Sequence, residues 1–283
     1  MNKQLAFVLG GGGARGALQV GALRALLEHG LQPDLLVGTS VGAVNATFLA
    51  LHGYSKQSLD LLTAAWHKAA SIDLLPANYL WLTVRAMFGR SSVNPSNRIR
   101  DFFIAQGLTP ELRFTDIRQP RLIIVSADLN TGKPVLHGES PDDEILEALL
   151  VSTALPPWAM PVRKQGRYLM DGGVVSSLPI EPALRAGATE ILALDLTDTR
   201  EIFSKGNGFG IFLDRLTFAV EKRQADLELE LAEARGVPIL YLDLIGKNPV
   251  PFWDFRHTDE LIAQGYETAQ QVIFSKSIQT VQV

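Results

Sequence analysis

The stretch Asp34-Leu35-Leu36-Val37-Gly38-Thr39-Ser40-Val41-Gly42 carries the most information in this chain. A short apolar run, which predicts a buried strand, leads into a G-x-S-x-G pentapeptide, and a helix is predicted from Val41 to His52. A strand-to-helix turn of this kind aims a serine out of a sheet, with a helix N-terminus behind it. Gly38 and Gly42 leave room for the turn. Ser40 is therefore a candidate nucleophile, and the alternative is that it only caps the helix.

A second strand–glycine–helix unit comes directly before the first. Leu5 to Leu9 predicts a buried strand, Gly10 to Gly16 a glycine-rich turn, and Ala14 to His29 a helix closed by Gly30. Two such units in succession favour a parallel sheet with helices on both faces. The predicted fold class is therefore α/β, a three-layer α/β/α arrangement with a mainly parallel central sheet.

The rest of the chain continues this alternation without a Pro-, Gly- or Ser-rich linker, so we expect a single domain over residues 1–283. Further strands are predicted at 121–127, 134–137, 168–170, 190–196 and 239–244. Further helices are predicted at 58–70, 79–88, 97–106, 140–155, 212–235 and 258–274, the fourth of these capped by Ser140. The apolar segment Tyr79–Phe88 has three interpretations: a lid, a membrane contact or part of the core.

The glycine cluster has two interpretations. Gly11-x-Gly13-x-x-Gly16 matches the dinucleotide-binding fingerprint, which also requires an acidic residue at the end of the second strand. Asp34 is at about the right distance but at the start of that strand. The alternative is an oxyanion hole, in which glycines let backbone N–H groups approach a carbonyl oxygen. Arg15 either adds positive charge there or lies on the helix surface.

A carboxylate follows the predicted strand at 168–170. In Asp171-Gly172-Gly173 the aspartate is positioned to accept the serine proton directly, or it belongs to an ordinary Asp-Gly turn. A Ser–His–Asp triad of Ser40, Asp171 and His257 is the competing device. His257 lies in a loop before the last helix, without special surroundings in the sequence.

Composition excludes several classes of protein. The 283 residues carry a net charge of −4 without a basic run, which argues against nucleic-acid binding. There are no cysteines, and the five histidines lack paired spacing, so we expect no disulfide and no metal site. Met1 to Leu5 lacks the pattern of a signal peptide, and no apolar run is long enough to span a bilayer. We therefore expect a cytoplasmic protein, peripheral to a membrane at most.

Taken together, the three motifs resemble the patatin-like phospholipase family. That family has a glycine-rich loop after the first strand, a G-x-S-x-G serine soon after it, and an Asp-Gly-Gly or Asp-Gly-Ala turn far downstream. The segment Val151–Pro156 is also similar to the family's pattern, whereas Ser177-Leu178-Pro179 departs from it, since asparagine often precedes that proline. The resemblance covers residues 5–196, which it implies are the catalytic core, with residues 197–283 completing the domain.

The resemblance implies that Ser40 is the nucleophile and Asp171 the proton acceptor, without a histidine or a cofactor. The implied reaction is hydrolysis of a phospholipid or lysophospholipid ester through an acyl-serine. It implies an oxyanion hole made by the amides of Gly11, Gly12, Gly13 and Ala14. Supporting motif positions are Arg15, Gly16, Gly38, Gly42, Gly172 and Gly173. Three alternatives stay open: a carboxylesterase, thioesterase or acyltransferase with the same dyad, a nucleotide-binding protein that uses Gly11 to Gly16, and a non-catalytic regulator.

Overall fold

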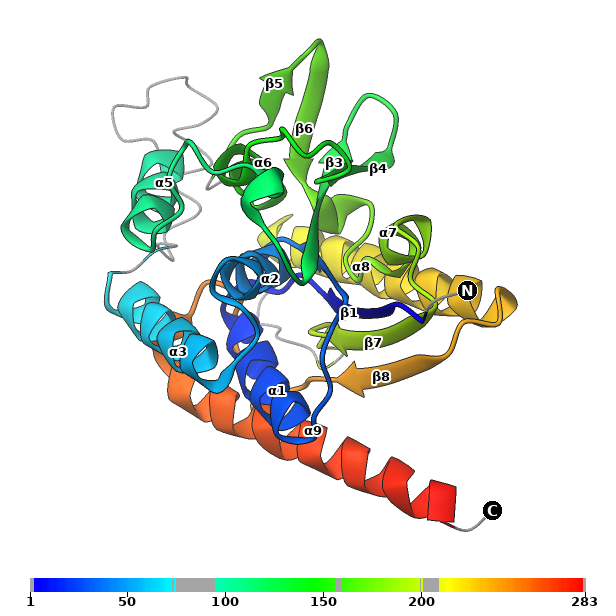
Figure 1. Ribbon diagram of the computed structural model, residues 1–283. Helices are drawn as coiled ribbons and strands as arrows, with labels where there is room; N and C mark the ends of the chain where they lie inside the picture. The colour runs from blue at the N-terminus through cyan, green and yellow to red at the C-terminus, as the bar shows by residue number, and fades with distance from the viewer. Residues whose placement is uncertain are drawn as a thin grey trace.

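A central sheet organises the chain, with helices on both of its faces (Figure 1). The computed structural model describes residues 3–72, 74, 95–155, 159–198, 200 and 209–281. The strands are β1 (Leu5–Leu9), β2 (Leu35–Thr39), β3 (Arg121–Asp128), β4 (Lys133–His137), β5 (Val162–Lys164), β6 (Arg167–Asp171), β7 (Glu190–Asp195) and β8 (Ile239–Asp243). The helices are α1 (Gly16–Glu28), α2 (Val41–His52), α3 (Lys56–Ser71), α5 (Pro95–Ala105), α6 (Ile145–Ser152), α7 (Ile180–Arg185), α8 (Phe209–Ala234) and α9 (Thr258–Val281).

The order of the strands brings the two glycine-containing turns together. The strands lie in the order β5-β6-β3-β2-β1-β7-β8, and β4 also pairs with β3. The five strands from β3 to β8 in this order are parallel, while β4, β5 and β6 run antiparallel to their neighbours. Val8 pairs with Val37, so β1 and β2 end at the same edge of the sheet. This confirms the predicted α/β class, and it places both turns at the carboxyl edge, where ligands bind in open α/β sheets.

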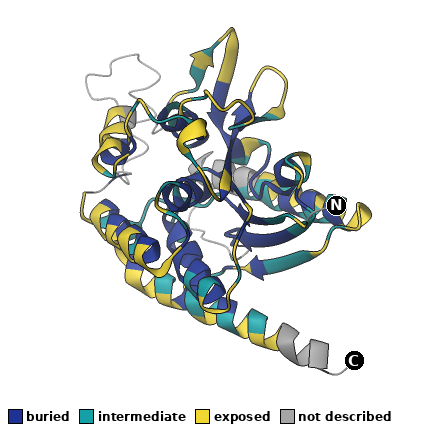
Figure 2. Cartoon of the chain, viewed as in Figure 1, coloured by how far each residue is buried: buried dark blue, intermediate teal, exposed yellow. Residues whose placement is uncertain are grey.

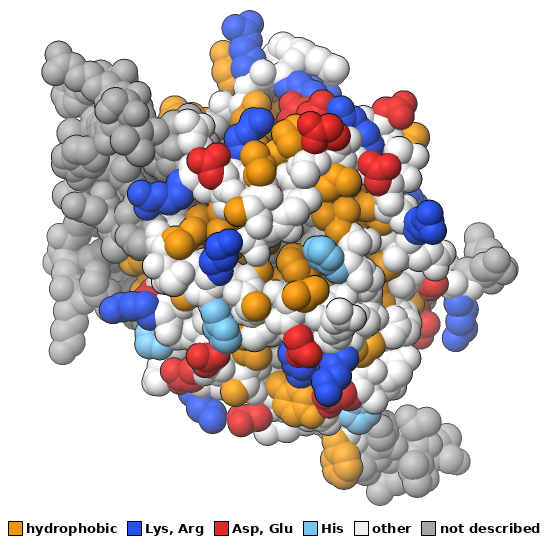
Figure 3. Space-filling model, turned by 60° about the vertical axis from the view of Figure 1, so that its left-hand side comes forward, with side chains coloured by type: hydrophobic (Ala, Val, Ile, Leu, Met, Phe, Trp, Pro, Cys, Tyr) orange, Lys and Arg blue, Asp and Glu red, His pale blue; other side chains and the backbone are white. Residues whose placement is uncertain are grey.

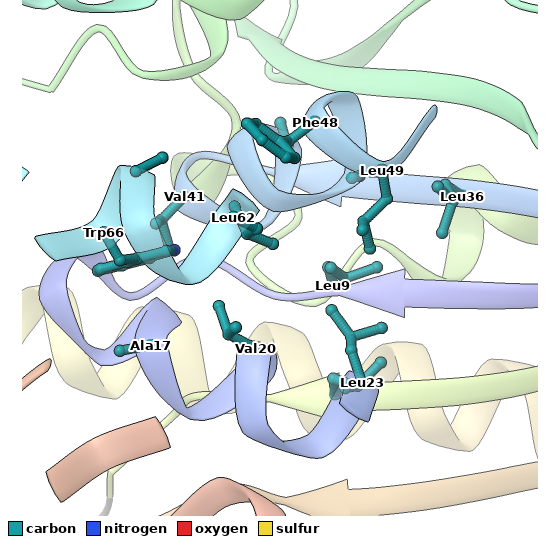
Figure 4. Close-up of a cluster of buried hydrophobic side chains, with 14 of the residues drawn as sticks. Leu9, Ala17, Val20, Leu23, Leu36, Val41, Phe48, Leu49, Leu62 and Trp66 are labelled. Atoms are coloured by element: carbon teal, nitrogen blue, oxygen red, sulfur yellow. The ribbon is translucent and has the colours of Figure 1, made fainter. Parts of the chain in front are cut away.

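The central strands β1, β2, β3 and β7 are buried, as Figure 2 shows by their dark blue colour. Phe7 and Leu9 of β1 pack into a large apolar cluster with α1, α2, α3, α6 and α9, whereas Ala6 and Val8 face a smaller one with α7 and α8. Figure 4 shows part of the first cluster, with side chains of α1, α2 and α3 around Leu9. Burial on both faces explains why the central strands are continuous apolar runs without alternation.

The last helix is held against the first by two glycines. A Cβ at Gly21 would lie 1.8 Å from the carbonyl oxygen of Ile262, and one at Gly265 would lie 1.9 Å from that of Leu18. Only glycine lets the two backbones approach this closely. α9, in orange to red, therefore runs directly along α1 in Figure 1.

Most predicted elements are observed within a few residues, but two boundaries are wrong. The last helix, predicted to end at residue 274, extends to Val281. The helix predicted at 140–155 begins at Ile145, so Ser140 is not its cap. The reason is competition for backbone groups. Thr115 N donates to Pro141 O at 2.8 Å and Ile145 N to Leu112 O at 3.2 Å, which ties residues 141–145 to a neighbouring segment instead of a helical turn.

Two elements were not predicted, and one prediction lies outside the described residues. The prediction omits strand β5, which pairs with β6 as a hairpin, and the short helix α7. The predicted helix at 79–88 lies outside the part of the chain that the structure describes. Across the described ranges, no helix combines the length and the apolar character that a bilayer crossing requires.

Candidate active site

Ser40 lies at the junction of β2 and α2 in a left-handed backbone conformation. Its φ of 54° and ψ of −126° are of a kind that costs a non-glycine residue about 1–3 kcal/mol. The side chain makes no capping bond to α2. Instead, Ser40 Oγ donates a hydrogen bond to Asp171 Oδ2 at 2.7 Å. The geometry therefore disfavours the interpretation of this serine as an ordinary helix cap.

The glycines on either side of the serine are required by close backbone approach. A Cβ at Gly42 would lie 2.1 Å from the carbonyl oxygen of Leu9, and one at Gly38 would lie 2.5 Å from the backbone nitrogen of Ala43. These distances are far inside van der Waals contact. Helix α2 thus starts tightly against the end of β1, which fixes the direction of the turn.

The carboxylate of Asp171 is buried at the end of β6. Its residue is 3 % exposed, and Oδ1 accepts from Gly173 N at 2.8 Å while Oδ2 accepts from Ser40. Burial raises the pKa of Asp171 to about 6, although the hydrogen bonds from Gly173 and Ser40 act in the opposite direction. A carboxylate with this pKa is ionised at neutral pH and more basic than an exposed aspartate.

One segment holds the backbones of both residues. Ser152 Oγ accepts from Ser40 N at 3.0 Å and donates to Val125 O at 2.7 Å. Two residues further on, Ala154 O accepts from Asp171 N at 3.1 Å. The stretch Val151–Pro156, which the sequence singles out without a role, thus connects the serine turn to the aspartate strand through its described residues.

The histidine of the alternative triad lies elsewhere. His257 is near Asp254 and Glu260, with side-chain N–O distances of 3.7 Å and 3.5 Å. Ser40 and Asp171 are in direct contact, so there is no space between them for an imidazole ring. The geometry favours a Ser40–Asp171 dyad over a triad that includes His257.

The glycine loop meets Ser40 at Gly11, and two of its amides are free. Gly11 N donates to Ser177 O at 2.9 Å and Ala14 N to Phe252 O at 2.7 Å, so these two amides are already occupied. Among the described residues, the amides of Gly12 and Gly13 have no acceptor. Of the four amides predicted for an oxyanion hole, only those of Gly12 and Gly13 are without an acceptor among the described residues. Gly11 lies directly against the serine, since a Cβ there would lie 3.4 Å from the Cβ of Ser40.

The dinucleotide interpretation finds no support in the position of its acidic residue. Asp34 Oδ2 accepts from Leu5 N at 2.8 Å, at the amino end of β1 and therefore at the opposite edge of the sheet from the glycine loop. In the ranges that the structure describes, no three His, Asp or Glu side chains gather as metal ligands.

A buried amide network fixes both ends of the glycine loop. Gln19 Nε2 donates to Gly10 O at 2.9 Å, and Asn45 Nδ2 donates to Gly16 O and to Gln19 Oε1 at 3.0 Å. Trp66 Nε1 donates to Asn45 Oδ1 at 3.0 Å. Gln19 and Asn45 are 0 % exposed. Sequence reasoning missed them, and the only signal was a polar residue on the apolar side of each helix.

The loop after Asp171 is held by serine and glutamate rather than by asparagine. Thr39 Oγ1 donates to Ser176 O at 2.9 Å. Ser176 Oγ donates to Glu228 Oε1 of α8, and Glu228 Oε2 accepts from Glu181 N at 2.8 Å. Burial raises the pKa of Glu228 to about 7, against the hydrogen bonds that it accepts. The sequence Ser177-Leu178-Pro179 lacks the asparagine that often precedes this proline in the family. Here Glu228 of α8 holds the loop.

Arg15 lies on the glycine loop among acidic side chains. Its Nε donates to Gly12 O at 3.2 Å. Its charge acts to lower the pKa of Glu221, and it adds to the larger effect of Arg200 in lowering the pKa of Asp198. Burial, and to a smaller extent the charge of Asp171, raises the pKa of Glu221 to about 7 in spite of Arg15. The arginine therefore partly balances the negative charge around the site, and it is not a plain surface residue.

Gly16, Gly172 and Gly173 also lie in this site. A Cβ at Gly16 would lie 2.6 Å from Val41, and one at Gly172 would lie 2.5 Å from Val125 O. Gly173 contributes its amide to Asp171. The structure thus brings together all the motif positions that the sequence singles out.

Comparison with known proteins assigns the chain to a class. The family described as patatin-like phospholipase matches residues 7–184. The chain therefore belongs to the patatin-like phospholipase family. The solved structure of human GIVD cytosolic phospholipase A2 has the same fold, with a TM-score of 0.56, 13 % identity, and coverage of 99 % of this chain and 59 % of that one.

Particular relatives are much longer than this chain. Human patatin-like phospholipase domain-containing protein 6 is 32 % identical over 193 residues, which are 68 % of this chain and 13 % of that protein. Lysophospholipase NTE1 of Meyerozyma guilliermondii is 24 % identical over 301 residues, or 97 % of this chain and 19 % of that protein. The chain thus spans less than a fifth of the length of these relatives.

Proposed function

We propose that this chain hydrolyses phospholipid or lysophospholipid esters, with Ser40 as nucleophile and Asp171 as proton acceptor. The observation that carries the proposal is the 2.7 Å hydrogen bond from Ser40 Oγ to Asp171 Oδ2 in a strand-to-helix turn. Membership of the patatin-like phospholipase family supports a lipid ester as substrate. The name lysophospholipase, carried by one relative, supports it further.

The proposed reaction has two halves. In the first, Asp171 takes the proton of Ser40 as Oγ attacks the ester carbonyl, and then gives that proton to the departing alcohol, which leaves an acyl-serine. In the second, Asp171 takes a proton from water, the hydroxide attacks the acyl-serine, and the proton returns to Ser40 Oγ as the fatty acid leaves. Because the carboxylate begins and ends ionised, one group serves both halves.

The negative charge that develops on the carbonyl oxygen needs donors. The amides of Gly12 and Gly13 are the proposed donors because they are free among the described residues and lie on the loop beside Ser40. The N-terminus of α2 adds a favourable dipole. One donor of this kind contributes about 3 kcal/mol to transition-state stabilisation. Gln19 and Asn45 are positioning residues for this loop.

The pKa of Asp171 sets the expected pH dependence. The carboxyl must be ionised to accept a proton, so kcat/KM should rise with pH and level off above about 6. Burial makes the carboxylate more basic than an exposed aspartate, which favours proton transfer from a serine.

The test is release of fatty acid from phosphatidylcholine and from lysophosphatidylcholine in mixed micelles. The chain should release fatty acid from at least one of them, and Ser40→Ala should abolish the release. Retained activity in Ser40→Ala, or no release from either lipid by folded protein, would overturn the proposal. Ser71→Ala is the matched control, because within the described part of the chain Ser71 Oγ bonds only Lys68 O, at the end of α3.

A further inference from the structure

Two hairpins project beyond the carboxyl edge of the sheet and expose large apolar side chains. Leu129, in the turn between β3 and β4, is 45 % exposed, and Tyr168 of β6 is 47 % exposed. Met160, two residues before β5, is 62 % exposed. A soluble surface can carry single exposed apolar residues, but three at one end of the molecule call for an explanation.

Strand pairing puts two of these residues in one row with a cation. Leu129 N donates to Tyr168 O at 2.9 Å, and Tyr168 is the register partner of Arg163 on β5. Ser126 pairs with Asp171, so Leu129 lies opposite Tyr168. Residues opposite each other in antiparallel strands share a face. Leu129, Tyr168 and Arg163 therefore form one exposed line across the hairpins, here called the hairpin row.

The charge around the hairpin row is positive, although the chain as a whole carries −4. Lys164 pairs with Glu147 at 2.8 Å, and Arg167 lies 3.7 Å from Asp128. Lys133 and Arg163 form no ion pair with any residue in the described ranges. The top of the molecule in Figure 3 shows Lys and Arg side chains next to hydrophobic ones, with Asp and Glu side chains just below them.

We propose that the hairpin row, together with Met160 just before β5 and Lys133 at the start of β4, docks on the surface of a bilayer that contains anionic lipids. Tyrosine and the apolar side chains suit the boundary between headgroups and acyl chains, and free Arg and Lys side chains suit the lipid phosphates. This inference rests on the proposed function, because docking on a bilayer would bring lipid to the proposed active site. Tyr168 precedes Asp171 by three residues of one strand, a span of about 10 Å.

The test measures binding without catalysis. The 283-residue chain with Ser40→Ala is sedimented with vesicles of phosphatidylcholine alone and of equal parts phosphatidylcholine and phosphatidylglycerol. We expect binding to the anionic vesicles that weakens with salt. The double change Met160→Ser with Tyr168→Ser should lower partitioning about tenfold or more, because two apolar side chains leave the boundary. Arg163→Glu should lower it at least about fivefold, and only on anionic vesicles.

Matched controls lie at other places on the surface. Leu61→Ser changes an apolar residue of α3 with 48 % exposure, and Arg235→Glu reverses an exposed charge just past the end of α8, near the start of β8. Neither should change partitioning. Circular dichroism checks that each variant is folded, and Leu129→Ser replaces the double variant if that one is not.

Three results would overturn the docking proposal. The protein could fail to bind anionic vesicles, or the control variants could lose as much partitioning as the hairpin-row variants. The third result is that the hairpin-row variants only dissociate a dimer, as measured by sedimentation velocity. A second assay distinguishes failure of the docking proposal from failure of the proposed function. It measures hydrolysis of water-soluble p-nitrophenyl butyrate by protein with Ser40 intact. Docking can fail while that hydrolysis persists. If the catalytic proposal fails, the soluble ester is not cleaved either.

Discussion

The amide of Gly11 donates to the carbonyl oxygen of Ser177 at 2.9 Å, which joins the glycine loop to the loop that follows Asp171. Thr39 makes a second such link through its hydroxyl to Ser176 O. The three motifs, spread over more than half of the sequence, are thus connected by direct hydrogen bonds. This arrangement pre-organises the serine, the carboxylate and the free amides before any substrate arrives.

The strain at Ser40 predicts an unusual order of stability among two inactive variants. Both Ser40→Gly and Ser40→Ala lose the nucleophile and the bond to Asp171, but only glycine tolerates φ of 54° without strain. We expect Ser40→Gly to be more stable than Ser40→Ala by about 1 kcal/mol, after the entropic cost of glycine. Urea unfolding of the two proteins measures this. An alanine variant as stable as the glycine variant would show that the backbone is not strained there.

The raised pKa of Asp171 predicts a pH-dependent gain in stability for Asp171→Asn. The folded protein holds the carboxyl proton more tightly, with a pKa of about 6, than the unfolded chain, with a pKa of about 3.9. The resulting stabilisation is fully present below about pH 4 and is lost as pH rises through about 6. Relative to Asp171→Asn, the wild type should therefore lose about 2 kcal/mol between pH 4 and pH 7.

Urea unfolding of both proteins at several pH values gives this difference. Ser40→Ala keeps the carboxyl group of Asp171 but removes a hydrogen bond that lowers its pKa. Its free energy of unfolding should therefore depend on pH as in the wild type, with the midpoint of the change displaced to higher pH. A difference between wild type and Asp171→Asn that does not vary with pH would contradict the assigned burial of the carboxylate.

The amide network predicts a joint effect on stability and reactivity. Asn45→Ala leaves Trp66 Nε1, Gly16 O and Gln19 Oε1 without their partner in a buried region, and should destabilise the protein by about 3 kcal/mol. Acylation by a fluorophosphonate should slow about tenfold, since small displacements of catalytic groups are costly. Trp66→Phe, which removes one donor, should have a smaller effect on both. Normal acylation in a destabilised Asn45→Ala would show that the network supports the fold alone.

Much of the fold was predictable because its signals are local. The strands β1 and β2 are apolar runs ended by glycine, and α2 begins and ends at the predicted residues. The start of α6 was not predictable, because Ser140 and Pro141 form a good local helix start that pairing with residues 112–115 overrides. The hairpin strand β5 has only three residues, too few for a periodic signal. The single-domain organisation stays a prediction.

The site was predictable in its motifs and unpredictable in its supports. Ser40, Asp171 and the glycine loop stand out in sequence because glycines mark tight turns. The geometry then narrows the four predicted amides to Gly12 and Gly13, since the others bond to distant carbonyl groups. Gln19 and Asn45 gave only the weak signal of a polar residue on the apolar side of a helix, and Glu228 gave none, because the role of all three depends on which helices meet.

The central claim is that Asp171 activates Ser40 directly. Its most direct test is the second-order rate of labelling by a fluorophosphonate probe, with the modified residue mapped by mass spectrometry. We predict labelling at Ser40 alone, a rate lowered at least about a hundredfold in Asp171→Asn, and an unchanged rate in His257→Ala. Labelling at another residue, or a loss in His257→Ala as large as that in Asp171→Asn, would contradict the dyad.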